Sequence, residues 1–353
     1  MKIIAYFLPQ FYHTPENDKY WGVGFTDWNS VKSSKKYFPR HKSPLRPTTL
    51  GYYNLDNNET IEKLCKYSME SGVDGFCYWH YWFGNGFQTL EKVPEMHLEN
   101  KSIEQDFFFS WANTSWTKSW VGDDSTIIFQ QEYSEESAIS HFNYLKSFFS
   151  DKRYLKYKGK PMFQVINPGN SSVKKHIFIL EKMSIEYFGH GLHWIFPELS
   201  NIKELKGLSY SLVGFPPGEF SKNNTFFKIK RKMQKYGILK NPVVVSEGEY
   251  LNSFKKNQRK WRNSNASYIP CLLSGWDNTP RYGNKGFIID AHISSLLKLQ
   301  IDELNALYKE GKNLDFIFIK AWNEWAEGNI LEDYSVNGND QKPLTMIKKI
   351  LNP

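Results

Sequence analysis

Cysteine is scarce in this 353-residue chain, and its few cysteines are poorly placed for cross-linking. Cys65, Cys77 and Cys271 lie far apart in apolar segments, and no two of them form a Cys-x-x-Cys pair. An odd number of cysteines without that spacing argues against a disulfide framework and against a zinc site. No two histidines are four residues apart, so the sequence also offers no histidine pair for a metal on a helix. We expect reduced thiols and no bound metal.

Long apolar runs and linker sequences are also lacking. No apolar run reaches the roughly 18 residues that indicate a membrane span. The first residues hold one lysine and a short apolar run, which predicts a strand over 2–8 rather than a secretion signal. No stretch rich in proline, serine and glycine divides the chain. We therefore expect one domain over 1–353, no integral membrane segment and a cytoplasmic location.

Several well-known enzyme motifs are missing. The chain has no GxSxG, no HExxH and no P-loop, and no glycine-rich phosphate fingerprint follows a predicted strand. We therefore expect no cofactor. The net charge of +8 comes mostly from dispersed lysines, and the basic stretch 228–235 predicts a solvated helix face. Contact with acidic polymers or lipid headgroups is the alternative for that stretch. The aromatic residues follow predicted strands near acids instead of alternating with basic patches, so we expect no nucleic-acid binding.

Short apolar segments typical of buried strands recur eight times along the chain. They cover 2–8, 73–79, 107–111, 162–166, 193–196, 210–215, 268–273 and 316–319. Most are followed by helical periodicity, and this repeated order predicts an α/β fold, a single (β/α)8 TIM barrel rather than an open doubly wound sheet. Long segments at 14–53 and 219–265 predict elaborated βα loops, the second with an extra strand at 243–245.

Polar and aromatic side chains recur where these strands end. In a barrel all such ends meet on one face, where catalysis is found. The candidates for substrate binding are Tyr6, Gln10, His80, Tyr81, Trp111, Asn113, Trp116, Trp276, Asp277, Arg281, Trp322 and Asn323. Amides and an arginine can bond sugar hydroxyls, while indoles cover the apolar faces of the ring. The alternatives are that His80 is a packed core histidine, that Trp79, Trp82 and Trp111 are core residues, and that Asp277 and Arg281 form a structural ion pair.

Two acids follow the last strand. Glu324 and Glu327 are three residues apart, so a helical turn after Asn323 would place them on one face. Glycosidic bond cleavage needs one carboxyl group that is protonated and one that is ionised. Trp322 and Trp325 beside the acids would raise a carboxyl pKa by desolvation. The alternative is a pair of surface glutamates on an ordinary loop.

Five blocks of sequence together resemble the WbsX family, which looks related to glycoside hydrolase family 99, the endo-α-mannosidase type. The blocks are Ala5–Phe11, Gly72–Phe83, Trp111–Asn113, Gly275–Arg281 and Trp322–Gly328. The resemblance spans nearly the whole chain and implies a (β/α)8 barrel that acts on bacterial polysaccharide or oligosaccharide. Proteins of this family are commonly called glycosyltransferases of surface-polysaccharide clusters.

The resemblance also implies roles for the two acids. The family 99 motif Asn-Glu-Trp-x-Glu-Gly is matched from Asn323 to Gly328, with Ala326 where the mannosidases usually have histidine. Carried over by position, Glu324 is the base that acts on the sugar's own 2-hydroxyl, which gives a 1,2-anhydro intermediate. Glu327 is then the general acid/base of a retaining reaction.

Three hypotheses follow. The first is a retaining glycoside hydrolase-like enzyme with Glu324 and Glu327 as its acid–base pair. The second is a glycosyltransferase of O-antigen or capsular polysaccharide synthesis with a nucleotide- or lipid-linked donor. The third is a glycan-binding barrel without catalysis. The sequence leaves the sugar, the linkage and the oligomeric state open.

Overall fold

The protein is built around a parallel sheet that curls into a barrel. The computed structural model describes residues 1–84, 86–118, 125–198, 202–205, 207–264, 267–308, 314–345 and 347. The barrel strands are β1 (Lys2–Phe7), β3 (Gly75–Gly84), β5 (Asp106–Trp111), β9 (Lys160–Val165), β10 (His193–Pro197), β11 (Ser209–Val213), β13 (Tyr268–Ile269), β14 (Cys271–Leu273) and β17 (Phe316–Lys320). Their spatial order is β13-β11-β10-β9-β5-β3-β1-β17-β14.

The two ends of this order belong to one stretch of chain. β13 pairs with β11 and β14 pairs with β17, and only Pro270 separates β13 from β14 in sequence. Proline has no N–H for a strand ladder, but the Pro270 carbonyl still accepts a hydrogen bond from Phe318 N at 2.9 Å. The predicted seventh strand therefore joins both edges of the sheet, and the predicted (β/α)8 TIM-barrel fold is confirmed.

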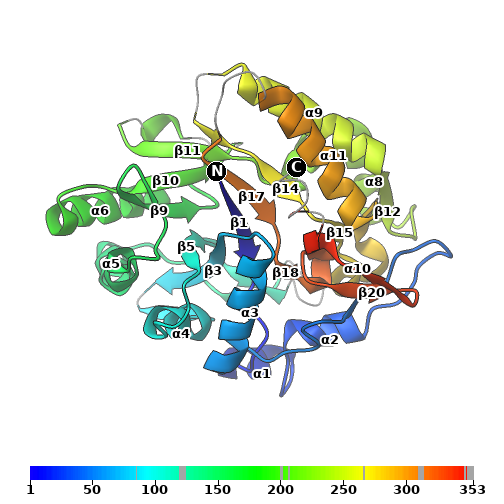
Figure 1. Cartoon of the computed structure of the whole chain (residues 1–353), viewed down its shortest axis with the longest axis horizontal. Helices are drawn as coiled ribbons and strands as arrows, with labels where there is room; N and C mark the ends of the chain where they lie inside the picture. Colours follow the sequence, from blue (N-terminus) through cyan, green and yellow to red (C-terminus); the bar gives the residue numbers. More distant parts are fainter. Residues whose placement is uncertain are drawn as a thin grey trace.

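Helices enclose the strands (Figure 1). The longer ones are α3 (Asn58–Glu70), α5 (Glu135–Ser150), α6 (Ser171–Phe188), α9 (Glu247–Arg262) and α11 (Ile293–Tyr308). In α3 the buried positions Ile61, Leu64, Cys65 and Ser68 follow a helical period, and the Asn57 side chain caps its first turn by accepting from Thr60 N. Because helices cover the outside and side chains fill the inside, the strands are apolar almost throughout; all five residues of β17 are buried.

Shorter elements decorate this frame. The additional helices are α1 (Pro15–Trp21), α2 (Asp27–Lys32), α4 (Lys92–Glu99), α7 (Gly218–Asn223), α8 (Thr225–Lys235), α10 (Thr279–Tyr282), η2 (Lys203–Leu205), η3 (Gly283–Lys285) and η4 (Trp325–Glu327). The additional strands are β2 (Arg46–Pro47), β4 (Phe87–Thr89), β6 (Trp116–Thr117), β7 (Ile127–Phe129), β8 (Lys156–Tyr157), β12 (Val243–Ser246), β15 (Trp276–Asp277), β16 (Phe287–Asp290), β18 (Asn323–Glu324), β19 (Asn329–Ile330), β20 (Tyr334–Val336) and β21 (Asn339–Gln341).

Two of the loop elaborations shape the rim of the barrel. The predicted extra strand is β12, which pairs with β16 and, through it, with β15 in a separate small sheet. Strand β2 of the first long loop pairs with β20 near the end of the chain. The predicted strand at 73–79 is longer in the structure, because β3 continues beyond the barrel to pair with β4. Among the described residues, no helix combines the length and apolar character needed to cross a bilayer.

Candidate functional site

A pocket of about 440 Å³ lies where the barrel strands end. Its lining residues are Leu8, Trp79, Tyr81, Ala112, Trp116, Ile166, Phe215, Pro216, Pro217, Gly218, Ser221, Trp276, Arg281, Lys320, Glu324 and Glu327. This volume falls within the roughly 300–1,000 Å³ range of small-ligand sites. Six predicted site residues therefore share one pocket: Tyr81, Trp116, Trp276, Arg281, Glu324 and Glu327.

The two acids reach the pocket through a tight turn after the last barrel strand. Asn323 and Glu324 form β18, which pairs with β19, and residues Trp325–Glu327 form the 3-10 turn η4. This is the helical turn that the sequence predicts, in its shorter 3-10 form. The Asn323 side chain fixes where the turn begins, since its Oδ1 accepts from Leu8 N at 2.7 Å and its Nδ2 donates to Leu8 O at 3.0 Å.

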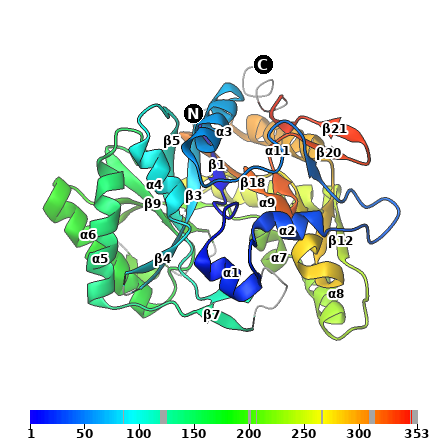
Figure 2. The same cartoon turned by 90° about the horizontal axis from the view of Figure 1, so that it is seen from below.

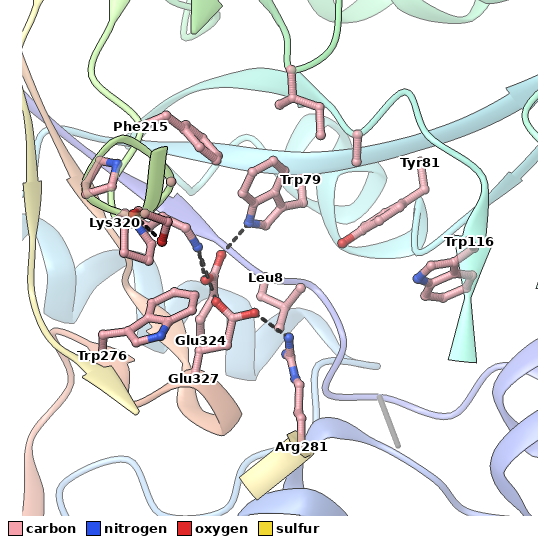
Figure 3. Close-up of a pocket in the computed structure, with 16 residues that line it drawn as sticks. Leu8, Trp79, Tyr81, Trp116, Phe215, Trp276, Arg281, Lys320, Glu324 and Glu327 are labelled. Atoms are coloured by element: carbon pink, nitrogen blue, oxygen red, sulfur yellow. Dashed lines mark hydrogen bonds and ion pairs between the residues drawn. The ribbon is translucent and has the colours of Figure 1, made fainter. Parts of the chain in front are cut away.

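Lys320 joins the two acids. Its Nζ donates to Glu324 Oε2 and, at 3.4 Å, to Glu327 Oε2. Three aromatic rings surround the ammonium group, with centroids 5.6 Å away for Trp276, 5.7 Å for Trp79 and 6.0 Å for Phe215. Figure 3 shows the ammonium group between the two carboxylates and the rings.

Each acid has a second partner of its own. Trp79 Nε1 donates to Glu324 Oε1 at 2.6 Å. Arg281 donates through NH1 to Glu327 Oε1 at 2.6 Å and through NH2 to the fully buried Asp27 at 3.2 Å. Asp27 Oδ2 also accepts from the backbone N of Ala326 at 3.3 Å, so it orients both Arg281 and the turn that carries the acids.

These surroundings push the pKa values of the two acids apart. Burial raises the pKa of Glu324 to about 7; the Lys320 charge opposes this rise and the Glu327 charge adds to it. Burial also acts to raise the pKa of Glu327, but the charges of Lys320 and Arg281 outweigh it and lower that pKa below its usual value. Because the two carboxyl groups are coupled, the pair holds one proton at mildly acidic pH, mainly on Glu324, and loses it as the pH rises through about 7.

Lys320 and Asp27 are site residues that sequence reasoning missed. Lys320 ends a strand that is otherwise apolar, and a lone charge at the carboxyl end of a barrel strand is a usable signal. Asp27 carries no such signal, because it lies in the first turn of α2, where an acidic residue commonly favours the helix terminus. Trp79 lines the pocket, whereas Trp82 and Trp111 lie in the core outside it.

Eight predicted site residues do not line this pocket within the described part of the chain: Tyr6, Gln10, His80, Trp111, Asn113, Asp277, Trp322 and Asn323. Most have structural partners. Tyr6 lies inside the barrel, stacks on Trp79 with centroids 5.3 Å apart, and donates to Gln164 Oε1 at 2.8 Å. Asp277 accepts from Thr279 at 2.7 Å and lies 2.9 Å from His41 Nε2, whereas Arg281 forms its ion pairs with Asp27 and Glu327.

The remaining residues of this group are also buried. Asn113 donates to Asn167 O at 2.9 Å, and Trp322 is buried against Phe76 with ring centroids 5.4 Å apart. The side-chain amide of Gln10 is buried without a hydrogen-bond partner among the described residues.

His80 and Trp111 face the helices because side chains alternate along a strand. Trp79 and Tyr81 of β3 line the pocket, so the intervening His80 faces the opposite way. There it begins a chain of three buried imidazoles, with His80 Nε2 and His141 Nε2 2.8 Å apart and His141 Nδ1 and His176 Nε2 3.0 Å apart. Trp111 packs against this chain, with its ring centroid 4.7 Å from that of His176.

The imidazole chain predicts acid sensitivity. Burial lowers the pKa of His80 to about 3 and that of His176 to about 4. Below an unfolded-state pKa near 6.5 the unfolded chain binds protons that the folded one does not, so stability falls as the pH drops from about 6.5 towards 4. Each histidine adds about 1.4 kcal/mol per pH unit to that slope. Urea unfolding between pH 6.5 and 4 measures how the free energy of unfolding depends on pH. His176→Gln should lessen this slope, whereas replacement of the exposed His13 by glutamine should not. Equal slopes in the two variants would contradict the assignment of the acid sensitivity to the imidazole chain.

The described residues contain no group of three or more His, Cys, Asp or Glu side chains arranged to hold a metal ion. In the pocket both carboxylates are instead bound by cationic side chains, Lys320 and Arg281. The arrangement provides a proton donor and a proton acceptor beside apolar rings.

Three comparisons place the chain among known proteins. The protein WxcX of Xanthomonas campestris pv. campestris, described as uncharacterized, is 25% identical over 339 residues in strains B100 and ATCC 33913. That match covers 94% of this chain and 47% of WxcX, so the chain spans about half the length of the curated relatives it matches.

Solved structures share the fold. A glycoside hydrolase-like protein has a TM-score of 0.64 at 13% identity, with 99% of this chain and 93% of that chain covered. The GH99 endo-alpha-mannosidase from Bacteroides thetaiotaomicron has a TM-score of 0.55 at 13% identity, with 99% and 97% covered. At these identities the likeness concerns the fold alone.

The family itself follows from the sequence comparison. The family model described as "Glycosyltransferase WbsX" matches residues 3–341, which is nearly the whole chain. The resemblance drawn from the five sequence blocks is thereby confirmed, and the chain belongs to the WbsX glycosyltransferase family.

Proposed function

We propose that this protein is a retaining glycoside hydrolase-like enzyme that acts on a bacterial polysaccharide or oligosaccharide. The observation that carries the proposal is the pair of acids in one aromatic-lined pocket, with Glu324 buried and both acids bound by Lys320. The pKa of Glu324 is raised and that of Glu327 is lowered, so the two acids differ in protonation, as an acid–base pair for glycosidic cleavage must. In the empty pocket the proton is favoured on Glu324, so the roles taken from the family motif require that it is held by Glu327 once the sugar is bound.

The proposed reaction proceeds in two steps, with roles carried over from the family 99 motif. Glu324 takes the proton of the sugar's 2-hydroxyl, O2 attacks C1, and the bond from C1 to the leaving oxygen breaks while Glu327 protonates that oxygen. In the second step Glu327 takes a proton from water, the water oxygen attacks C1, the C1–O2 bond of the anhydro sugar breaks, and O2 recovers its proton from Glu324. Two inversions at C1 give overall retention.

The pKa values of Glu324 and Glu327 affect how each can serve as base or acid. A pKa of about 7 lets Glu324 exchange its proton near neutral pH, where the ionised fraction can act as a base. Glu327 is ionised in the empty pocket, and a bound sugar that displaces water favours its protonated form. The reverse assignment, with Glu324 as the acid, predicts a different mutant pattern, which is described in the Discussion.

The lining supports a neutral saccharide as substrate. Both cations in the pocket, Lys320 and Arg281, are already paired with carboxylates. The rings of Trp276, Phe215 and Trp79 lie near the acids, and Tyr81 stacks on Trp116 with centroids 5.5 Å apart farther along the pocket (Figure 3). Such rings bind the C–H faces of pyranoses.

The test is incubation of the protein with purified bacterial O-antigen and capsular polysaccharides. We expect new reducing ends, and proton NMR during the first turnovers should show the product anomer of the same configuration as the substrate. The absence of cleavage with every glycan, or an inverted product, would contradict the proposal.

A glycosyltransferase is the second candidate, and the family's description favours it. In the same chemistry an acceptor hydroxyl would replace water in the second step. Transfer to an added acceptor glycan without release of free sugar would establish this alternative. Glycan binding without turnover under any condition would leave the third hypothesis, a binding barrel.

A further inference from the structure

Helix α8 presents an apolar stripe to solvent. Phe226, Ile229 and Met233 have exposed fractions of 59%, 51% and 39%. Their spacing of three and four residues places them on one face of the helix. Exposed Tyr236 and Ile238 follow directly after the helix ends. The helix lies at the edge of the molecule in both views (Figure 1 and Figure 2).

The opposite face of α8 is anchored, so this stripe is not a core face turned outward. Phe227 packs between Phe220 and Phe287, with centroid distances of 5.4 Å and 4.9 Å. Gln234 Nε2 donates to the carbonyl oxygens of Asn284 at 2.7 Å and Gly286 at 3.0 Å. These contacts fix the rotation of the helix about its axis and hold the stripe away from the barrel.

Basic residues flank the stripe. The helix TFFKIKRKMQK holds four lysines and one arginine and no acidic residue. Lys228 and Lys232 lie on one side of the stripe, and Lys230 lies on the other with its Nζ 4.6 Å from the centroid of the Phe226 ring. The sequence predicts a solvated basic face for this segment, whereas the structure shows apolar side chains among the lysines.

We propose that α8 is an interfacial helix that binds a membrane surface carrying anionic lipids. A row of apolar side chains between lysines matches helices that lie in the headgroup region, where the stripe enters the acyl boundary and the ammonium groups meet lipid phosphates. The lysines favour this partner over a protein, because protein interfaces are depleted of lysine. At a bilayer, lysine side chains extend their charge to the headgroups while their stems stay in apolar contact.

Helix α8 follows closely in sequence a segment that lines the pocket, so a membrane bound to α8 would lie near the pocket. Gly218 and Ser221 of α7 line the pocket, and α8 begins at Thr225, so the same stretch of chain forms the pocket rim and the membrane contact. Docking through α8 would bring that rim close to the lipid headgroups. The proposal concerns binding alone, and it stands or falls independently of the proposed reaction.

The test is flotation of the full chain with two kinds of vesicle, one of phosphatidylcholine alone and one of equimolar phosphatidylcholine and phosphatidylglycerol. We expect binding to the anionic vesicles only, with weaker binding as salt is added. Ile229→Asp combined with Met233→Asp should reduce the partition coefficient about tenfold or more, because both apolar contacts are lost. Lys228→Gln and Lys232→Gln should each reduce it about fivefold.

A matched control comes from other helices. Ile185 on α6 is 50% exposed and Met69 on α3 is 39% exposed, nearly the same as Ile229 and Met233. The double variant Ile185→Asp with Met69→Asp should bind anionic vesicles like the unmodified protein. The proposal is overturned if the unmodified protein does not float with anionic vesicles, or if both double variants bind equally well. It is also overturned if the stripe proves to mediate self-association, seen in sedimentation as a dimer that Ile229→Asp dissociates.

Discussion

Glu327→Gln is expected to lower the turnover of a natural glycan by about 10²- to 10⁴-fold, the usual contribution of a general acid–base group. The amide keeps the size of the side chain and can still accept from Arg281, but it cannot donate a proton to the leaving oxygen. The measurement is the rate of release of reducing ends under single-turnover conditions.

A substrate with a better leaving group distinguishes the general acid from the base. With a 2,4-dinitrophenyl glycoside the departing oxygen needs no proton, so Glu327→Gln should regain most of the first-step rate. Glu324→Gln should stay slow with either substrate, because the base is still missing. If Glu324→Gln is the variant rescued by the better leaving group, the two roles are reversed.

Glu332→Gln provides a control for this experiment. Glu332 is also a buried glutamate: it accepts from Trp325 Nε1 at 2.6 Å and from Tyr53 at 2.9 Å, and it is not among the residues that line the described pocket. Burial raises its pKa to about 8, so the carboxyl group is already mostly neutral at pH 7 and an amide resembles it. Turnover should change less than about threefold. Equal losses in all three variants would indicate general damage to the fold and would contradict the assignment of an acid–base pair.

Lys320→Met is expected to shift the pH dependence of kcat/KM and to destabilise the protein. Lys320 lowers the pKa of both glutamates, so its loss raises both. In the unmodified protein kcat/KM should fall as the pH rises through about 7, where the coupled pair of glutamates loses the one proton that the reaction needs. In Lys320→Met that fall should move to higher pH.

The stability effect of Lys320→Met depends on pH in a defined direction. Without the lysine, the buried acids prefer the neutral form in the folded state, so folded pKa values lie above the unfolded ones. Stability is then lost as pH rises from about 4 through the new folded values. Breaking a buried ion pair costs about 3–5 kcal/mol, which we expect in full at pH 8 and only in part at pH 5. Urea unfolding at the two pH values measures the difference.

Lys298→Met is the matched control for this variant. Lys298 also pairs with an acid, Asp302, at 2.6 Å, but both side chains are about half exposed. A surface pair of this kind contributes about 1 kcal/mol at most. The role of Lys320 would be refuted if Lys320→Met and Lys298→Met had the same small effect, or if Lys320→Met left the pH profile unchanged. Lys320→Arg, which keeps the charge, should keep most of the profile.

The barrel was predictable because its strands are buried on both sides and each is bounded by turn signals. The seventh strand shows the limit of this signal. Its apolar run 268–273 predicts one continuous strand, and Pro270 divides it into β13 and β14 without opening the ring. The apolar run shows that these residues are buried. It does not show that the strand is interrupted at Pro270, because the interruption arises from the backbone N–H that proline lacks.

The site was only partly predictable, for geometric reasons. Proximity to a strand end identified Tyr81 and Trp276 correctly as pocket residues, but it also selected His80, which the alternation of β3 turns outward. Applying the two-residue period to β3 would have chosen Trp79 and Tyr81. Asp27 is beyond such reasoning, since it is separated from Ala326 by nearly the whole chain and meets it only in the folded protein.

The order of the strands has a consequence for synthesis on the ribosome. Strand β17 lies between β1, the barrel strand that precedes all others in the sequence, and β14, and the chain just beyond β17 supplies both acids. A nascent chain that has emerged only as far as β16 holds the aromatic wall of the cavity but leaves two sheet edges unpaired. The two acids and the closure of the ring thus arrive together, only once β17 and the turn after it have emerged. A product truncated before β17 would therefore lack both acids and be prone to aggregate through those edges.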